Sequence, residues 1–417
     1  MSEYKNHHYV PEWYQYRFFD GSEKEKKLNY LDLRPKVETA SNGKKYTRKD
    51  LLKWGPPSCF CQDDLYTTRF KGVESKEIET AFFGEIDSKG SKAVDYFSSF
   101  KHPSVDPEAF KDLLPYISVQ KLRTPKGLKN LSSMTDEKGR NRLLFAMQKL
   151  HKMHCALWSE AVWSIVDARQ SNTKFIISDH PVTVYNQGAF PQSKYCRNFS
   201  DPAIWLDGTY TIFPLSFDKA LILTNLSWLR NPYDNPLKER PHSDLFRNSY
   251  FNFTDIQTSR MLLEEEVVAI NYIIKSRAYR YIAAQKKEWL YPENYLNIKS
   301  WDKIGSSYLL MPDPRAISFS SEVVFGYENS RAEVFDEYGR KPWQADYREK
   351  HRHEMEWISF NAFKGEFARK FGQKRRGASL DIGYKLKTED NDERHAYHLS
   401  LEKEFKAKLK HKKREKF

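Results

Sequence analysis

Hydrophobic positions before residue 160 recur with the period of amphipathic helices. From Tyr66 to Phe97, apolar residues recur at spacings of three and four, which predicts one or two helices with a charged outer face. A second helix is predicted over residues 107–122, and Pro125 discourages its continuation. A third is predicted over residues 140–158. These blocks form a set of helices that can cover one face of a sheet.

After residue 160 the pattern becomes that of strands. The segments 161–168, 174–186 and 209–224 are rich in β-branched and aromatic residues and are separated by turn formers. They predict an antiparallel sheet, followed by a long helix from Ser259 to Lys287. A short strand is also expected within residues 29–35. Helices packed on a mostly antiparallel sheet make residues 1–290 an α+β domain.

The hydrophobic pattern weakens beyond residue 290. The composition shifts toward Gly, Ser, Arg and Lys, so residues 291–417 are expected to form a basic C-terminal extension. Its last seventeen residues carry eight Lys or Arg against three Glu, in a composition that favours helix. This end is interpreted either as a solvated helical tail or as a segment that binds phosphate.

The overall charge indicates a polyanionic partner. The 417 residues include 69 Lys plus Arg and 56 Asp plus Glu, a formal net charge of +13. This excess favours nucleic acid or a nucleotide, although a basic protein without such a partner has the same composition. The four cysteines are too few and too irregular for a disulfide framework or a four-thiolate zinc site. No apolar run approaches about 18 residues, so a cytoplasmic protein without a membrane partner is expected.

Several polar and aromatic motifs follow one another along the chain. The most specific are HHYVPEWYQYRFF at residues 7–19 and FIISDHPV at 175–182. The others are DDLYT at 63–67, SVQKLRTP at 118–125, IFPLS at 212–216 and VVAINYIIKSRAYRYI at 267–282. In this order they resemble the domain of unknown function 4238 family over about residues 1–285. That family occurs in prokaryotes without an assigned reaction, so the resemblance implies a fold and site positions.

The motifs supply the groups needed to handle a phosphodiester. His7 and His8 are adjacent in a predicted strand, so they point to opposite faces and at most one faces a given pocket. Asp179 interrupts a strand pattern within Ser178–Pro181, where the strand is expected to bend or end. Arg123 can clamp a phosphate or carboxylate with two hydrogen bonds. The predicted catalytic residues are His7, His8, Arg123 and Asp179.

Three further residues are predicted to bind substrate. Gln120 precedes Arg123 by three residues and therefore lies on the same helical face. Asn271 and Arg277 are polar positions in an otherwise apolar helical stretch. Structural interpretations stay open for this set: Asp179 caps a turn, Arg123 fastens the helix end to the opening strand, and Asn271 fixes helix register.

Two other chemistries are weaker. Glu79 could join His7 or His8 and Asp179 to bind Mg²⁺ or Mn²⁺, although no recognised spacing of metal ligands supports such a site. Arg348 and His353, in REKHRHE, fit the Arg-x4-His signature of small helical ribonucleases. So short a motif is expected by chance in a basic segment.

These observations predict a nucleic-acid- or nucleotide-processing protein. The specific form expected, by analogy alone, is a nuclease-like effector of prokaryotic defence against phage or plasmids. The alternative is a non-catalytic module that binds nucleic acid or a protein through its basic C-terminal region. No P-loop, dinucleotide-binding glycine turn or zinc-finger spacing is present, which removes the commonest nucleotide-driven and zinc-dependent classes.

Overall fold

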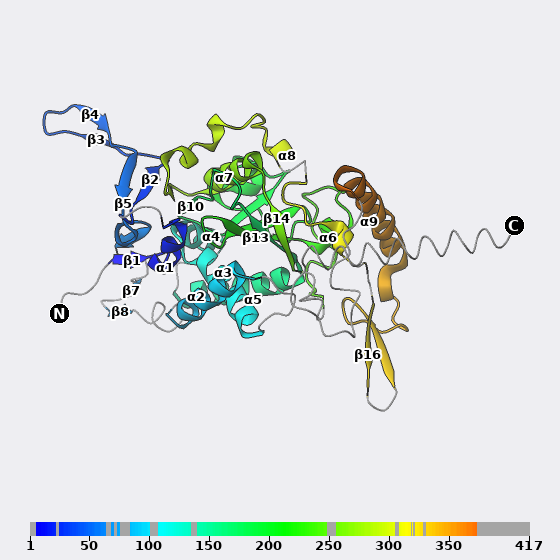
Figure 1. Cartoon of the computed structure of the whole chain (residues 1–417). Helices are drawn as coiled ribbons and strands as arrows, with labels where there is room; N and C mark the ends of the chain where they lie inside the picture. The colour runs from blue at the N-terminus through cyan, green and yellow to red at the C-terminus, as the bar shows by residue number, and fades with distance from the viewer. Residues whose placement is uncertain are drawn as a thin grey trace.

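A five-stranded sheet forms the centre of the computed structural model (Figure 1). The structure describes residues 6–21, 25–63, 68–70, 73–75, 84–100, 107–134, 140–247, 256–304, 308–317, 319, 322–327 and 331–372. The strand order is β11-β12-β13-β9-β14, in which β14 runs parallel to β9 and the other pairs are antiparallel. The strands are β9 (Val162–Asp167), β11 (Thr183–Asn186), β12 (Thr209–Pro214), β13 (Lys219–Thr224) and β14 (Gln257–Met261).

The central sheet is buried on both faces because successive side chains of a strand point to opposite sides. In β13, Leu221 and Leu223 join one hydrophobic cluster, whereas Ala220 and Ile222 join a second. The first cluster lies under a layer of four helices and the second under α7 (Glu264–Arg277) (Figure 1). The four are α2 (Gly84–Ser98), α3 (Pro107–Leu122), α4 (Pro125–Met134) and α5 (Arg140–Glu160). The predicted α+β fold is therefore confirmed.

A second, four-stranded sheet brings distant parts of the chain side by side. Its order is β10-β15-β2-β5, and every neighbouring pair is antiparallel. Strands β3 and β4 extend this sheet outward as a two-stranded ribbon, and β1 pairs with β6. The bounds are β1 (Asn6–His8), β2 (Leu28–Asp32), β3 (Val37–Thr39), β4 (Lys45–Thr47), β5 (Leu51–Trp54), β6 (Cys61–Asp63), β10 (Ile177–Ser178) and β15 (Tyr281–Ala284).

The long helix predicted from Ser259 to Lys287 is wrong at both ends. Its first residues belong to β14, and α7 covers only Glu264–Arg277. Residues Tyr281–Ala284 form β15, which lies between β10 and β2 and pairs with both. Pairing with β10 and β2 gives the backbone of β15 the hydrogen bonds that a continued helix would otherwise supply. The tertiary pairing therefore overrides the local helical pattern of this segment.

The strand pattern over residues 174–186 becomes two strands that belong to different sheets. β10 ends at Ser178 and β11 begins at Thr183, so the chain turns at the predicted bend. Helix α4, which begins at Pro125, is an element that the sequence analysis did not expect. Proline is compatible with the first turn of a helix, where its missing N–H would have no partner within the helix.

Residues 308–317 and 350–371 contribute to the cluster on the α7 side of the central sheet, whereas the strands of residues 322–326 and 332–336 project away from it (Figure 1). Helix α9 (Lys350–Phe371) places Phe360, Phe363 and Phe367 in the cluster that contains Ile270 of α7. The core thus continues across residue 290 into the predicted C-terminal extension, whose residues 373–417 lie outside the described residues. The remaining elements are β7 (Thr68–Phe70), β8 (Val73–Ser75), β16 (Glu322–Gly326), β17 (Ala332–Asp336), α1 (Glu12–Gln15), α6 (Leu226–Arg230) and α8 (Trp301–Ile304).

No helix in the described part of the chain is both long enough and apolar enough to cross a membrane.

Candidate functional site

Asp179 lies at the bend after β10 and binds backbone amides. Its carboxylate accepts hydrogen bonds from the backbone N–H groups of Tyr279 (2.8 Å), Arg280 (2.6 Å) and Tyr281 (2.9 Å), which connect α7 to β15. The side chain is buried, and burial raises the pKa of Asp179 to about 6 although the three amides favour the charged form. These contacts match the turn-capping interpretation, because the carboxylate satisfies donors left between a helix and a strand.

Gln120 and Arg123 are brought together at the end of α3. Gln120 donates through Nε2 to the carbonyl oxygen of Tyr9 (2.9 Å), and its Oε1 accepts from Arg123 Nε (2.8 Å). The Arg123 guanidinium also binds both carboxylate oxygens of Asp87 in α2, at 2.7 and 2.8 Å. The side chain is only 2% exposed, so the two-pronged clamp predicted for phosphate holds a carboxylate of the chain itself.

His7 and His8 lie on opposite sides of β1, as its alternation predicts. His7 is buried, while His8 is half-buried near the molecular surface. His8 Nε2 lies 3.2 Å from the carbonyl oxygen of Pro57 and 3.6 Å from Glu12 Oε1. His8 is therefore held against α1 and the turn before β6.

Asn271 and Arg277 on α7 each bind other parts of the chain. Asn271 donates to the carbonyl oxygen of Lys174 (2.8 Å) and accepts from the N–H of Ile176 (3.1 Å), which fixes α7 against the segment that enters β10. Arg277 donates to Cys196 Sγ (2.8 Å) and to the carbonyl oxygen of Ala189 (2.5 Å). Both side chains are buried, so these contacts hold segments of the fold together.

A buried charged centre beside Asp179 escaped the sequence analysis. Asp201 accepts hydrogen bonds from Lys121 and from Lys126 (2.5 Å), and its Oδ2 lies 2.9 Å from His180 Nε2. Burial opposes the charged carboxylate, but the two ammonium groups hold the pKa of Asp201 well below its usual range. Burial lowers the pKa of His180 to about 3, which keeps its imidazole neutral. The sequence carried part of the signal, since the lysines flank the RTP motif and His180 follows Asp179, but nothing local marks Asp201.

Thr124, His180 and Asp201 have the order of a nucleophile, a base and an orienting acid. The hydroxyl of Thr124 lies 2.7 Å from His180 Nδ1, but it also accepts the N–H of Gly127 (3.1 Å) in the first turn of α4. The Thr124 side chain is completely buried. A nucleophile must reach its substrate, so this arrangement acts as a helix cap and a support for the bend.

Metal ligands do not gather in the described residues. No group of three His, Cys, Asp or Glu side chains there is placed to hold a metal ion. Glu79, the carboxylate predicted to join the histidines and Asp179, lies outside the described residues. The prediction of Mg²⁺ or Mn²⁺ binding therefore stays a prediction.

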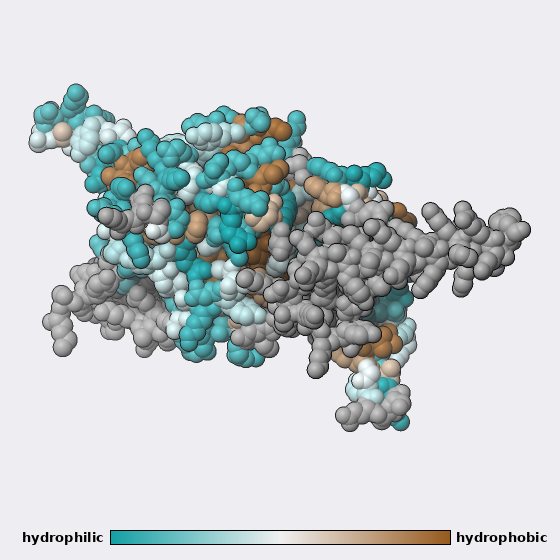
Figure 2. Space-filling view, in the orientation of Figure 1, coloured by the Kyte–Doolittle hydropathy of each residue, from teal (hydrophilic) through white to brown (hydrophobic). Residues whose placement is uncertain are grey.

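A basic ribbon projects from the sheet that contains Asp179's partners (Figure 1). It comprises residues 34–53, with seven Lys or Arg against two carboxylates, and Figure 2 shows this projection as largely hydrophilic. Backbone bonds from Asp32 N to Asp50 O (2.8 Å) and from Arg48 N to Lys36 O (2.9 Å) continue the β2–β5 ladder into the ribbon. From the sequence, only a short strand within residues 29–35 was expected here, and the charge of the segment was not interpreted as a binding signal.

Stacked aromatic rings connect the base of the ribbon to the bend at Asp179. The rings of Trp54 and Tyr30 stack at 5.3 Å between centroids, and those of Tyr30 and Tyr281 at 4.9 Å. The guanidinium of Arg280 lies 4.8 Å from the Tyr281 centroid. Since Arg280 and Tyr281 also donate to Asp179, the motif residues and the ribbon share one packed support.

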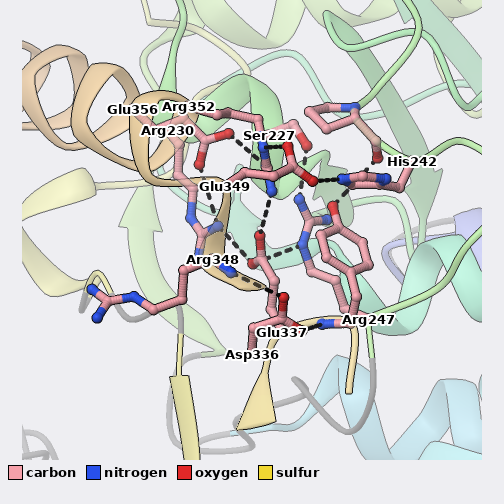
Figure 3. Close-up of polar contacts among 12 residues, drawn as sticks. Ser227, Arg230, His242, Arg247, Asp336, Glu337, Arg348, Glu349, Arg352 and Glu356 are labelled. Atoms are coloured by element: carbon pink, nitrogen blue, oxygen red, sulfur yellow. Dashed lines mark hydrogen bonds and ion pairs between the residues drawn. The ribbon is translucent and has the colours of Figure 1, made fainter. Parts of the chain in front are cut away.

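A second charged cluster joins the C-terminal elements to α6 and to Arg247 (Figure 3). Arg230 of α6 and Arg247 bind the same oxygen of Glu337, at 2.7 and 3.0 Å. Arg352 of α9 binds Glu356 at 3.0 Å and lies 3.6 Å from Glu337. Burial opposes the charge on Glu337, but the arginines lower its pKa to about 2. This network connects α6, the β17 end and α9.

A small, partly open pocket with room for about one water molecule lies at the edge of this network. In it Arg348 NH2 lies 3.4 Å from His353 Nε2, so the Arg-x4-His pair meets in space. Figure 3 shows the Arg348 side chain directed away from the buried ion pairs. Burial, aided by Arg348, lowers the pKa of His353. The lining residues are Asp336, Glu337, Arg340, Arg348, Arg352, His353 and Glu356.

Comparison with known proteins identifies one family. A family model described as "Protein of unknown function (DUF4238)" matches residues 6–288. No curated protein and no solved structure matches the chain. The matched range contains the Asp179 bend and the basic ribbon but ends before the Arg348–His353 pocket.

Proposed function

This chain belongs to the DUF4238 family, and we propose that it binds nucleic acid through the basic ribbon of residues 34–53. One observation carries the proposal. Four exposed ribbon lysines have no carboxylate within ion-pair distance in the described part of the chain. Positive groups presented in this way neutralise phosphates and release bound counterions, which drives association with nucleic acid. The four are Lys36, Lys44, Lys45 and Lys49.

The contacts of the predicted catalytic residues favour binding over catalysis at the motif site. Arg123 already holds Asp87, and Asp179 already holds three backbone amides. Groups that are buried and saturated in this way support a surface more readily than they reach a substrate. The alternative left open by the sequence, a non-catalytic nucleic-acid-binding module, thus has the stronger support, with the ribbon as its contact surface.

The test is a fluorescence anisotropy titration with labelled DNA and RNA over a series of salt concentrations. A Lys44→Glu, Lys45→Glu double variant should bind at least about tenfold more weakly, and its log–log salt slope should become shallower by about two, since each lost phosphate contact changes the slope by about 0.9. The matched control is Lys149→Glu, Lys152→Glu on the exposed face of α5, which changes the net charge equally.

The control should bind within about twofold of the wild-type protein, because general charge repulsion is weak at moderate salt. An equal loss of affinity in the two double variants would contradict a specific role of the ribbon. Failure of the wild-type protein to bind any DNA or RNA at about 50 mM salt would contradict the proposed function itself.

Phosphodiester cleavage at the C-terminal pocket is a second candidate, favoured by the contact between Arg348 and His353. A neutral imidazole can accept a proton from an attacking hydroxyl. The Arg348 guanidinium binds Glu322 at 3.2 Å, but unlike Arg123 it is partly exposed, so it can exchange this carboxylate for a phosphate. The conformation around the pair supports a special role, since Arg348 (φ 59°) and Glu349 (φ 35°) occupy the left-handed region that non-glycine residues rarely adopt.

The cleavage candidate is tested by incubating the protein with labelled single- and double-stranded DNA and RNA, with Mg²⁺, with Mn²⁺ and with a chelator. His353→Gln should abolish cleavage and leave nucleic-acid binding unchanged, whereas His351→Gln, an exposed histidine two residues away, should cleave normally. Intact substrates under all conditions would remove this candidate without affecting the binding proposal. A role in defence against phage or plasmids stays a prediction from the sequence.

A further inference from the structure

The form of the ribbon indicates which nucleic acid it fits. We propose that the β3–β4 ribbon enters the major groove of double-stranded DNA, with the face of Val37, Thr39, Lys45 and Thr47 turned toward the bases. This inference rests on the proposed nucleic-acid binding and adds the substrate class and the contact face to it.

The dimensions of the ribbon match those of the groove. From the Arg48–Lys36 backbone bond to the Ala40–Lys44 bond the two strands extend over four residues, or about 13 Å at about 3.3 Å per residue. This length exceeds the depth of about 8.5 Å of the B-DNA major groove, whose width of about 12 Å admits a two-stranded ribbon. The minor groove, at about 6 Å, and the narrow major groove of RNA duplexes do not.

The tip of the ribbon is compact and polar. The N–H of Gly43 donates to the carbonyl oxygen of Ala40 (2.8 Å), and Ala40 N–H donates to Lys44 O (2.9 Å). Gly43 has φ +79°, a conformation that glycine adopts without strain. Asn42 Oδ1 accepts the N–H of Lys44 (3.0 Å). A closed tip of small residues can approach base edges without a bulky side chain in the way.

The two faces of the ribbon differ in charge and chemistry. The register pairs Glu38 with Tyr46 on one face. There the Tyr46 hydroxyl donates to the Glu38 carboxylate (2.9 Å), and Arg48 Nε lies 3.3 Å from the same carboxylate. The opposite face pairs Val37 with Thr47, and Thr39 with Lys45, and carries no carboxylate.

That carboxylate-free face has the groups suited to the floor of the major groove. Threonine hydroxyls can donate to or accept from base edges, and threonine and valine methyl groups contact the thymine methyl. The Val37 side chain is 64% exposed, so it contributes little to packing within the described residues. Lys45 on this face and Lys44 beside it are placed to bind phosphates on the rims of the groove.

Single-stranded nucleic acid fits the ribbon less well. Proteins that bind single strands present several exposed aromatic rings on which successive bases stack. Between residues 34 and 53 Tyr46 is the single aromatic residue, and its hydroxyl is bound to Glu38 on the face away from the proposed contact. The observations therefore favour a duplex.

The experiment compares labelled 20-base-pair DNA, single-stranded DNA of the same sequence and an RNA duplex by anisotropy at constant salt, using the full chain. Two further samples block one groove each. In DNA whose cytosines carry 5-glucosyl-hydroxymethyl groups, the sugars fill the major groove, and in DNA bound to the drug netropsin, the drug fills the minor groove. We expect the DNA duplex to bind at least tenfold more tightly than the other two. Glucosylation should abolish this preference, and netropsin should leave it unchanged.

Two variants with the same charge change test the contact face. Thr47→Glu places a carboxylate on the proposed contact face and should lower affinity for the DNA duplex more than tenfold. Tyr46→Glu places one on the opposite face and should lower it less than threefold; thermal melts confirm that both variants are folded. Equal effects of the two variants, or loss of binding with netropsin instead of glucosylation, would overturn the groove assignment while leaving nucleic-acid binding intact. Absence of binding to all three nucleic acids would overturn the proposed function as well.

Discussion

Replacing Asp179 with alanine separates a structural role of this residue from a catalytic one. The substitution removes the acceptor of the backbone N–H groups of Tyr279, Arg280 and Tyr281. These donors lie at the transition from α7 to β15, where Asp179 is buried and the alanine side chain supplies no acceptor. We therefore expect Asp179→Ala to destabilise the fold.

The magnitude follows from two opposing effects. Three buried donors without partners cost about 1–3 kcal/mol each, or about 3–9 kcal/mol together. Against this, the substitution relieves the burial of a charge. A pKa raised from 3.8 to about 6 corresponds to about 3 kcal/mol at pH 7, at 1.36 kcal/mol per unit. The difference between the two effects is about 0–6 kcal/mol, and its midpoint of about 3 kcal/mol is the expected net loss.

The pH dependence gives this prediction a distinctive sign. Because the folded state holds the Asp179 proton up to about pH 6, the wild-type protein gains stability from this group as the pH falls through 6 toward 3.8. The alanine variant lacks that gain. The difference in unfolding free energy between the two proteins should therefore grow by about 1 kcal/mol between pH 7 and pH 5.

Urea unfolding followed by tryptophan fluorescence at pH 7 and pH 5 measures both quantities. Asp32→Ala is the control, since Asp32 forms a half-buried ion pair with the same Arg280 and should cost about 1 kcal/mol or less. The reasoning is refuted if Asp179→Ala unfolds at the wild-type urea concentration. If that stable variant also lost nucleic-acid binding or cleavage, Asp179 would be a functional residue, as the sequence first predicted.

Three other perturbations follow from the packing and the charges. Gly90→Ala should lower the free energy of unfolding by about 1–3 kcal/mol, because the added Cβ would lie 2.5 Å from the Tyr116 ring; thermal melts measure this. Burial lowers the pKa of His154 to about 3, so the folded state binds fewer protons than the unfolded state. The free energy of unfolding should therefore fall as the pH drops below 6.5. In urea titrations, His154→Gln should reduce that fall. Arg247→Met should cost about 3–5 kcal/mol in urea unfolding, because it removes a buried partner of Glu337.

Each of these perturbations has a control at an exposed position. Gly326→Ala adds its Cβ to open space, His351→Gln changes an exposed imidazole, and Arg169→Met removes a largely exposed arginine. All three should stay within about 0.5 kcal/mol of the wild-type protein. A Gly90 or Arg247 variant as stable as its control, or a His154 variant with the wild-type acid response, would contradict the corresponding assignment.

The candidate site shows where sequence reasoning stops. The pattern located the bend at Asp179 correctly, because proline and polar residues interrupt a strand locally. It did not show that the carboxylate binds amides a hundred residues later, or that Arg123 reaches Asp87 in another helix. Both residue types bind phosphate as readily as they bind groups of the chain, so composition alone left the two interpretations equal.

The buried charged centre around Asp201 and the basic ribbon were missed from the sequence for two different reasons. Asp201 lies in a segment without periodicity, and only the fold places it between Lys121 and Lys126. The charge of residues 34–53 was visible in the sequence, but its meaning depends on a projecting ribbon in which Glu38 is confined to one face. A run of lysines in a buried or unstructured segment would not have the same consequence.

The sequence by itself determined the α+β class, the helix at 107–122, the strands at 161–168 and 209–224, and membership of the family over most of the chain. These features follow from local hydrophobic period and from short motifs, which neighbouring residues specify. Tertiary structure alone decided that Tyr281–Ala284 is a strand, which groups Asp179 binds and that Arg348 meets His353. Each of these depends on partners supplied by another element, because a backbone amide or a charged side chain takes its partner from the packing around it.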